Sequence, residues 1–295
     1  MSDTSAIEKL PGIKKHELMS RHTTFKIGGP ADYYFVARSK PDIVQAISSA
    51  RSSQLPYLVI GHGSNLLVSD AGIRGLVIRI ENDGISRAGS RVTADAGVSL
   101  GRLALWTVEQ GLTGAEFISG IPGSIGGSIR GNAGAMGGEL KDIVVCVEAL
   151  DEAGQFRILA NSECQFAYRD SRFKHNSEII ISAVFQLAAG QPAVGLARLK
   201  EYALKRSATQ DYSIPSAGCM FKNPAGQSAG KLIDDLGFKG RRVGDAMVSP
   251  THANFITNVG HATAAQVVEL VALIKQSVLE KHGIELGTEV QFIGF

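Results

Sequence analysis

The sequence predicts an α/β protein, in the broad sense that includes α+β folds. Segments with strand and helix periodicity alternate along the chain, and 295 residues suffice for two domains, or for one large α/β unit, with a sizeable core. Hydrophobic residues make up 44% and charged residues 20% of the chain, which is typical of a globular protein and argues against a disordered or fibrous one.

Charge and cysteine content narrow the class of protein. With 30 basic and 28 acidic residues the formal net charge is +2, which argues against binding to nucleic acid or a membrane surface through bulk charge. The first ten residues lack the pattern of a signal peptide and no run of 18 apolar residues follows, so we expect a cytoplasmic protein. Three cysteines without a CxxC pair suggest thiols rather than disulfides, and we expect no metal site.

The first predicted elements alternate between helix and strand. Ser39 caps a helix that has Pro41 at its start, after a polar N-terminal segment. A strand over 57–60 runs into the loop GHGSN (61–65), and 75–80 predicts a second strand. The segment 91–100 then leads into a helix that ends near Gly111.

The middle of the chain is rich in glycine. The segment 111–138 holds the densest group of the 34 glycines and predicts ordered loop with a short helix. Strands are predicted over 142–150 and 178–187, on either side of the stretch FAYRDSRFK (166–174). An amphipathic helix from Pro192 to Arg206 predicts the bridge to a second domain, so we place the domain boundary near 190–207.

The last ninety residues have the pattern of a separate core. A long helix begins with the capping-box pattern Thr263-x-x-Gln266 and ends at Gly283. A final strand over 289–293 would hold a catalytic residue on a sheet rather than on a loose tail.

Two glycine-rich loops predict a site for a large phosphate-bearing ligand. GHGSN follows a strand directly and offers main-chain N–H groups without side-chain obstruction. It is not a Rossmann fingerprint, because Leu66 stands where glycine is needed, and AGKL (229–232) does not make a P-loop. GIPGSIGG (120–127) with GNAGA (131–135) is a second such region, and two anchoring loops suit a dinucleotide.

Three polar residues are candidates for chemistry, each with a plainer alternative. Cys219 is either a small buried hydrophobe or a proton donor or nucleophile, because a thiol near its ordinary pKa of about 8.5 is mostly protonated at neutral pH. Arg169 is either an ion-paired structural residue beside Asp170 or a bidentate partner for a carboxylate or enolate. Glu289 would by default face solvent on the last strand.

Nine segments taken in order resemble the UDP-N-acetylenolpyruvoylglucosamine reductase (MurB) family and cover nearly the whole chain. They are TTFKIGGPA (23–31), IGHGSNLLVSD (60–70), GIPGSIGG (120–127), GNAGAMGGE (131–139), YRDSRFK (168–174), SAGCMFKNP (216–224), AGKLIDDLGFKG (229–240), HANFITN (252–258) and EVQFIG (289–294).

The resemblance implies two FAD-binding α/β subdomains of the vanillyl-alcohol-oxidase type and a C-terminal α/β substrate-binding domain. These would follow an N-terminal segment 1–20 and occupy 21–190 and 191–295. The implied FAD contacts, non-covalent, are Gly61, Gly63, Ser64, Asn65, Ile121, Pro122, Gly123, Ser124, Gly127, Asn132, Ala133 and Gly134. The implied substrate contacts are Lys222, Asn223, Lys231, His252 and Asn254. No room is found between strands 142–150 and 178–187 for the tyrosine insertion of the family's longer type.

The resemblance also implies the reaction. NADPH, the co-substrate, would reduce FAD, which would pass hydride to C3 of an enolpyruvyl UDP-sugar in peptidoglycan precursor synthesis. Arg169 and Glu289 match the family's catalytic arginine and glutamate, and Cys219 stands where the family usually has a serine that protonates C2. A thiol has a pKa several units below that of an alcohol, so activity should survive this substitution at the cost of sensitivity to oxidation.

We expect the protein to be a monomer. Three other functions remain open. One is another FAD-dependent oxidase or dehydrogenase of the same flavin-binding superfamily. Another is an inert flavin- or nucleotide-binding module in which Cys219 senses redox state. The third is a cysteine hydrolase that uses Cys219 and His252, which would leave the glycine loops unexplained.

Overall fold

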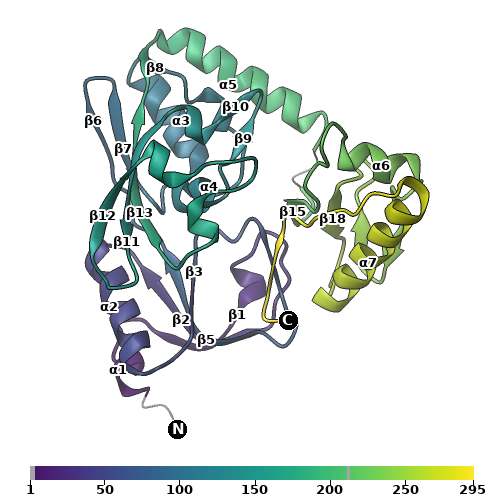
Figure 1. Cartoon of the computed structure of the whole chain (residues 1–295), viewed down its shortest axis with the longest axis horizontal. Helices are drawn as coiled ribbons and strands as arrows, with labels where there is room; N and C mark the ends of the chain where they lie inside the picture. The colour runs from purple at the N-terminus through teal and green to yellow at the C-terminus, as the bar shows by residue number, and fades with distance from the viewer. Residues whose placement is uncertain (1–3, 211–212) are drawn as a thin grey trace. The chain divides into compact units, whose positions relative to one another are not determined.

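The computed structural model describes residues 4–210 and 213–295. The described chain divides into two compact units that interleave along the sequence (Figure 1). The first unit is drawn from Met1–Ile13, Phe35–His62 and Val77–Arg206, and the second from Lys14–Tyr34, Gly63–Leu76 and Ser207–Phe295. The predicted segment 1–20 and the predicted domains 21–190 and 191–295 stay a prediction.

A five-stranded antiparallel sheet forms the centre of the first unit, with strand order β12-β11-β13-β7-β6. Its strands are β6 (Ile85–Ala88), β7 (Arg91–Asp95), β11 (Val144–Leu150), β12 (Phe156–Ala160) and β13 (Ile179–Gln186). Ala183 is in register with both Val147 and Ala94, and all three are buried, because alternate residues of these strands face the core. The strands predicted over 142–150 and 178–187 are thereby confirmed within two residues at each end.

Helices and short strands complete the first unit. The helices are α1 (Ser5–Glu8), α2 (Lys40–Ser52), α3 (Leu100–Glu109), α4 (Ile125–Arg130) and α5 (Pro192–Ser207), with 3-10 turns η2 (Glu116–Ile118), η3 (Leu140–Asp142), η4 (Asn161–Cys164) and η5 (Arg172–Lys174). The remaining strands are β3 (Tyr57–Ile60), β8 (Leu112–Thr113), β9 (Gly134–Ala135), β10 (Gly138–Glu139) and β14 (Ala188–Ala189).

Helix ends follow their predicted signals more closely than helix faces do. The Ser39 side chain accepts a hydrogen bond from the Asp42 amide at the start of α2, so the predicted cap is confirmed. Helix α5 has the predicted bounds within one residue, but Gly195 is its one buried residue among those described. Of its leucines, Leu196 and Leu204 are exposed and Leu199 is half-buried. In the described part of the chain every helix is too short or too polar to cross a bilayer.

A four-stranded antiparallel sheet with order β15-β18-β17-β16 lies in the second unit, together with two helices. The elements of this unit are β1 (Lys14–Leu18), η1 (Met19–Arg21), β4 (Leu66–Val68), β15 (Ser216–Cys219), α6 (Ala229–Asp235), β16 (Arg242–Val243), β17 (Ala246–Val248), β18 (Phe255–Asn258), α7 (Ala264–His282) and β19 (Gln291–Ile293). Strands β2 (Pro30–Ala37) and β5 (Ile73–Ile80) contribute residues to both units. Helix α7 packs against β16 and β17.

The core of the second unit combines early and late parts of the chain. Phe25, Ile27 and Leu67 are buried in one cluster with apolar residues of α6, β17, β18 and α7. Helix α7 has the predicted capping box and ends at Gly283 in the left-handed conformation, as predicted. Its first two amides also donate to the Asp70 carboxylate, at 2.8 and 3.0 Å. The early segments are therefore structural parts of this unit.

Candidate active site

The loop GHGSN has the properties of an anion-binding segment. In residues 4–210 and 213–295, no main-chain amide from 61 to 64 donates a hydrogen bond to another protein group, although the loop is half-buried. Gly63 has φ +66°, and a Cβ there would overlap the His22 carbonyl oxygen. Main-chain amides that donate to no protein group in a half-buried loop can donate to the pyrophosphate of a dinucleotide. This segment is therefore compatible with the predicted FAD contacts.

Gly61 brings the first predicted FAD loop against the second. A Cβ at Gly61 would overlap the Ser124 hydroxyl, so only glycine allows this approach. Ser124 caps helix α4 by accepting a weak hydrogen bond from the Gly127 amide at 3.5 Å. The next amide, that of Ile125, donates to the Val98 carbonyl at 2.8 Å. Gly61 is thus packed against the Ser124 side chain, and the second glycine region is fixed by the main-chain bond between Ile125 and Val98, as a rigid cofactor site requires.

His62, in the same loop, is a neutral group near neutral pH. Burial lowers the pKa of its imidazole, and the positive charge of Arg79 lowers it further. A hydrogen bond with the Gly97 main chain opposes this shift in part. The ring therefore adds no positive charge to the loop, and the anion-binding capacity of the loop comes from its amides.

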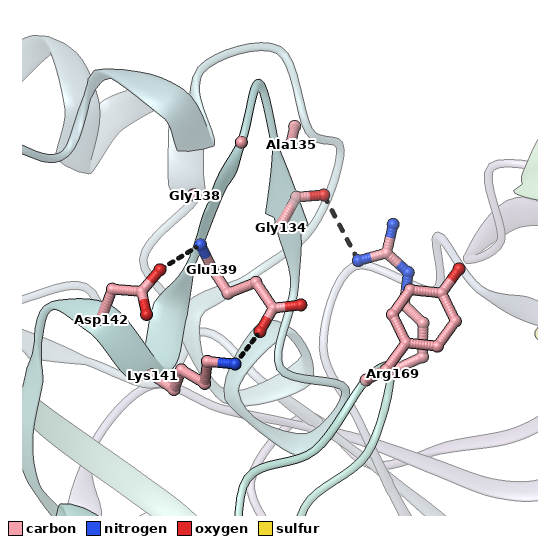
Figure 2. A pocket seen from close by; sticks show the side chains of 9 residues that line it. Gly134, Ala135, Gly138, Glu139, Lys141, Asp142 and Arg169 are labelled. Carbon is pink, nitrogen blue, oxygen red and sulfur yellow. Dashed lines mark hydrogen bonds and ion pairs between the residues drawn. The ribbon is translucent and has the colours of Figure 1, made fainter. Parts of the chain in front are cut away.

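A cavity of about 380 Å³ lies beside the segment 132–134, which is predicted to contact FAD. Its lining residues are Gly134, Ala135, Gly137, Gly138, Glu139, Lys141, Asp142, Tyr168 and Arg169. Strands β9 and β10 form a small hairpin over it, and both residues of the turn, Met136 and Gly137, have positive φ. Figure 2 shows Glu139 paired with Lys141, at 2.7 Å, on one side and Arg169 on the other.

Arg169 is held in a strained backbone conformation. It has φ +54°, which is unusual for a residue with a side chain. Ala167 and Asp170 exchange two main-chain hydrogen bonds of 3.1 Å around it, and the Lys174 ammonium donates to the Arg169 carbonyl at 2.5 Å. The guanidinium donates to the Gly134 carbonyl at 3.3 Å (Figure 2). Backbone strain of this kind is typical of functional residues. The hydrogen bonds of the turn and of the guanidinium hold a positive charge at the cavity.

Cys219 and Glu289 lie on neighbouring chain segments of the second unit. Cys219 ends β15 opposite Phe255, and its side chain is half-buried. The Glu289 amide donates to the Met220 carbonyl at 2.8 Å, next to a bridge between Phe221 and Thr288. The prediction that Glu289 lies within the last strand was wrong, because β19 begins at Gln291. Glu289 is nevertheless held by main-chain pairing rather than on a loose tail.

Asn65 supports Glu289 directly. Its amide nitrogen donates to the Glu289 carbonyl at 3.1 Å, and its own carbonyl accepts from the Gln291 amide at 3.0 Å. Parallel pairing of β4 with β19 continues this contact. A residue predicted to bind FAD therefore also holds the predicted catalytic glutamate, while its contact with FAD stays a prediction.

The predicted substrate contacts lie in the second unit and differ in exposure. Asn254 is buried, and its side chain accepts from the Phe221 amide at 3.0 Å and donates to the Phe221 carbonyl at 2.8 Å. Exposed Asn223 accepts from the Ala229 amide at 3.0 Å, and exposed Lys231 pairs with Asp235. Their contacts with substrate stay a prediction.

His252 is the substrate candidate with unused hydrogen-bonding capacity. Its Nδ1 is buried, and it has no partner among the described residues. Burial of the ring lowers its pKa, so the imidazole is neutral near neutral pH. Lys222 is half-buried and its amide donates to the Gly287 carbonyl at 2.9 Å.

Sequence reasoning missed part of the first unit's site. Tyr168, Glu139 and Lys141 line the cavity with Arg169, and none of them was predicted. The hairpin that carries Glu139 has methionine rather than asparagine or aspartate in its turn, so it lacks the usual sequence signal. Arg169 and the segments 121–134 belong to the first unit, whereas Cys219, Glu289 and the substrate candidates belong to the second.

Comparisons with known proteins match two stretches of the chain. Residues 31–160 match a family described as FAD binding domain, and 209–293 match one described as UDP-N-acetylenolpyruvoylglucosamine reductase, C-terminal domain. UDP-N-acetylenolpyruvoylglucosamine reductase of Caldanaerobacter subterraneus is 41% identical over 98% of this chain and 98% of its own. The reductase of Desulforamulus reducens is 44% identical over 96% of this chain and 94% of its own.

A solved structure extends the likeness to the fold. The crystal structure of the reductase from Thermus caldophilus matches with a TM-score of 0.81 and 36% identity, covering 94% of this chain and 97% of that one. The predicted fold class and resemblance are therefore confirmed. The chain belongs to the UDP-N-acetylenolpyruvoylglucosamine reductase family.

Proposed function

We propose that this protein is an FAD-dependent enzyme that uses NADPH to reduce the enolpyruvyl group of UDP-N-acetylglucosamine enolpyruvate. The product is the D-lactyl ether, UDP-N-acetylmuramate, a precursor of peptidoglycan. The observation that carries this proposal is the 41% identity to a named reductase over 98% of both chains. Identity of that extent leaves no part of the catalytic or the cofactor-binding domain without a counterpart.

The residues that would hold FAD belong to the glycine loops. The amides of 61–64 would receive the pyrophosphate, and the segments 121–124 and 132–134 would line the flavin. The chemistry that bound FAD would supply there is hydride transfer, from NADPH to C3 of the enolpyruvyl group.

Arg169 would stabilise the charge that appears on the substrate. Addition of hydride at C3 leaves an electron pair at C2, which delocalises into the neighbouring carboxylate. A guanidinium with a fixed position can hold such an enediolate by charge-assisted hydrogen bonds. Support comes from the rigid turn around Arg169, because a group that is already oriented loses little energy to reorganisation during the reaction.

Cys219 would complete the reaction by donating its thiol proton to C2. The C–H bond forms as the S–H bond breaks, and the thiolate is later reprotonated from solvent. Glu289 would act as a hydrogen-bond donor or proton-network partner beside it. Support comes from the main-chain hydrogen bond that joins Glu289 to Met220, the residue after Cys219. General acids typically contribute about 10²–10⁴-fold to a rate.

Substrate and cellular setting complete the proposal. Lys222, Asn223, Lys231, His252 and Asn254 would contact the UDP-sugar, and the buried Nδ1 of His252 is the strongest support among them. The enzyme would work in the cytoplasm, where its NADPH and nucleotide-sugar substrates occur, and as a monomer.

Anaerobic flavin spectroscopy tests this function. We expect the purified protein to be yellow, to bleach with NADPH and to regain its oxidised band when UDP-N-acetylglucosamine enolpyruvate is added. The variant Cys219→Ala should bleach normally but regain the band about 10²-fold or more slowly. Reoxidation by oxygen alone would refute the reductase in favour of an oxidase, and absence of reduction by NADPH would favour an inert flavin-binding module.

A further inference from the structure

The side chain of Asn132 is committed to the protein rather than to a ligand. Asn132 is fully buried, with φ +42°. Its amide nitrogen donates to the Glu139 carboxylate at 3.1 Å and to the Ala167 carbonyl at 3.0 Å. Its oxygen accepts from the Lys141 amide at 3.0 Å. Because a primary amide has two N–H donors, both are used, and none is left for a flavin.

The bond to Ala167 reaches the turn that carries Arg169. Ala167 and Asp170 exchange two hydrogen bonds, so the four-residue turn 167–170 moves as one piece. The Arg169 guanidinium donates to Gly134, which lies two residues after Asn132. The segment 132–134 and the turn are thus joined through the Asn132 side chain and through Arg169 itself. Figure 2 shows the second of these contacts, between Arg169 and Gly134.

We propose that Asn132 is a positioning residue that sets the orientation of Arg169. This inference rests on the role of Arg169 in the proposed function. Loss of the Ala167 bond would remove the contact between the Asn132 side chain and the turn, and would leave the longer Arg169–Gly134 hydrogen bond, at 3.3 Å, to join the segment 132–134 to it. Misplacement of a charged catalytic group by about 1 Å can cost about 10²-fold in rate. Asn132 thereby acts on the substrate step through Arg169 and leaves flavin binding to the main chain.

A double-mutant cycle tests this route. We expect Asn132→Ala to slow flavin reoxidation by the enolpyruvyl substrate about 10–100-fold. Reduction by NADPH and the Kd for FAD should stay within about twofold of wild type. In an Arg169→Ala background, Asn132→Ala should slow reoxidation no further, because its effect passes through the missing guanidinium.

A second variant exchanges the donor to Ala167 for an acceptor and keeps the other two hydrogen bonds of the side chain. In the pair Asn132→Asp with Glu139→Gln, the new carboxylate still accepts from the Lys141 amide, and the new glutamine donates to it. The exchange deletes the hydrogen bond to the Ala167 carbonyl and sets an oxygen against it, while Glu139→Gln alone controls for the altered ion pair with Lys141. Urea unfolding checks that the exchanged pair is folded, and the pair should slow reoxidation about tenfold or more relative to Glu139→Gln.

Asn161→Ala is the control for the loss of an asparagine that bridges main-chain carbonyls. Asn161 is half-buried, and its side-chain amide donates to the Lys141 and Val144 carbonyls, at 2.8 Å each, rather than to the 167–170 turn. It should lose stability without losing the substrate step.

The possible outcomes separate the two proposals. Equal slowing of the wild-type and Arg169→Ala enzymes by Asn132→Ala, or a large rise in the Kd for FAD, would overturn the positioning role alone. If Arg169→Ala itself reoxidised at the wild-type rate, the catalytic role of Arg169 would fail and the Asn132 inference with it.

Discussion

Glu116→Gln should destabilise the first unit by an amount that depends on pH. The Glu116 side chain is only 3% exposed and accepts hydrogen bonds from the Thr113 hydroxyl at 2.6 Å and the Gly114 amide at 2.7 Å. Arg198 of helix α5 lies 3.6 Å from the same carboxylate. In the glutamine variant the oxygen can still accept from the Gly114 amide, and the NH₂ group can donate to the Thr113 hydroxyl, so both contacts become neutral hydrogen bonds. We expect a loss of about 1–3 kcal/mol near pH 7, from the change of two charge-assisted bonds to neutral ones.

The pH dependence follows from the pKa of Glu116. Burial alone would raise this pKa, but the hydrogen bonds from Thr113 and Gly114 with the charge of Arg198 lower it overall from 4.5. A lowered folded-state pKa adds stability above the ordinary value, and this is lost as pH falls through the folded-state pKa. The gap between wild type and Glu116→Gln should therefore be widest above about pH 5 and shrink at lower pH.

Urea unfolding followed by tryptophan fluorescence measures this effect. The chain has one tryptophan, Trp106 on α3, and α3 packs against η2, which carries Glu116. The signal therefore reports on the first unit. Glu109→Gln, at the exposed end of α3, is the matched control and should change stability by less than about 0.5 kcal/mol. Equal loss in the two variants at pH 7, or a gap that stays constant into acid, would refute the reasoning.

Three further outcomes are expected. Asp70→Ala should destabilise the second unit by about 1–2 kcal/mol, because it removes the acceptor for two amides at the start of α7, and faster hydrogen exchange in α7 would reveal it. Gly63→Ala should weaken FAD binding more than tenfold in a flavin fluorescence titration, since its Cβ would overlap the His22 carbonyl and its φ is +66°. Cys219→Ser should retain turnover and resist inactivation by hydrogen peroxide, which residual activity after a timed exposure would measure.

Local elements were predictable because their signals are local. The caps at Ser39 and Thr263, and the left-handed end at Gly283, each depend on a hydrogen bond or backbone angle within four residues. Strand β2 lies in the part of the chain before Ser39 that was predicted only as a polar segment, although its run from Tyr33 to Val36 has high strand propensity. The hairpin β9–β10 was missed because two-residue strands have no periodicity to detect.

The composition of the two units was not predictable from local pattern. Gln291 pairs with Leu66 across most of the chain, and Phe25 and Ile27 enter the same core as α7. Such pairings depend on which apolar faces meet in space, and a single sequence carries no direct signal of that. The candidate site residues were found through the resemblance, whereas their hydrogen-bond partners were found in the structure.

The asparagines show most clearly why residue type alone does not tell whether a side chain contacts a ligand or supports the main chain. Asn65, Asn132 and Asn254 were all predicted to contact a ligand, and in each the side-chain amide is bonded to the main chain of another segment. Glycine-rich loops have no helix or sheet ladder, so their main-chain groups need other partners. A side-chain carboxamide offers the same kinds of donor and acceptor as a peptide group and can supply the missing hydrogen-bond partner. An asparagine whose amide is bonded to the main chain of another segment is therefore evidence for a rigid site first, and a contact with the ligand has to be shown separately.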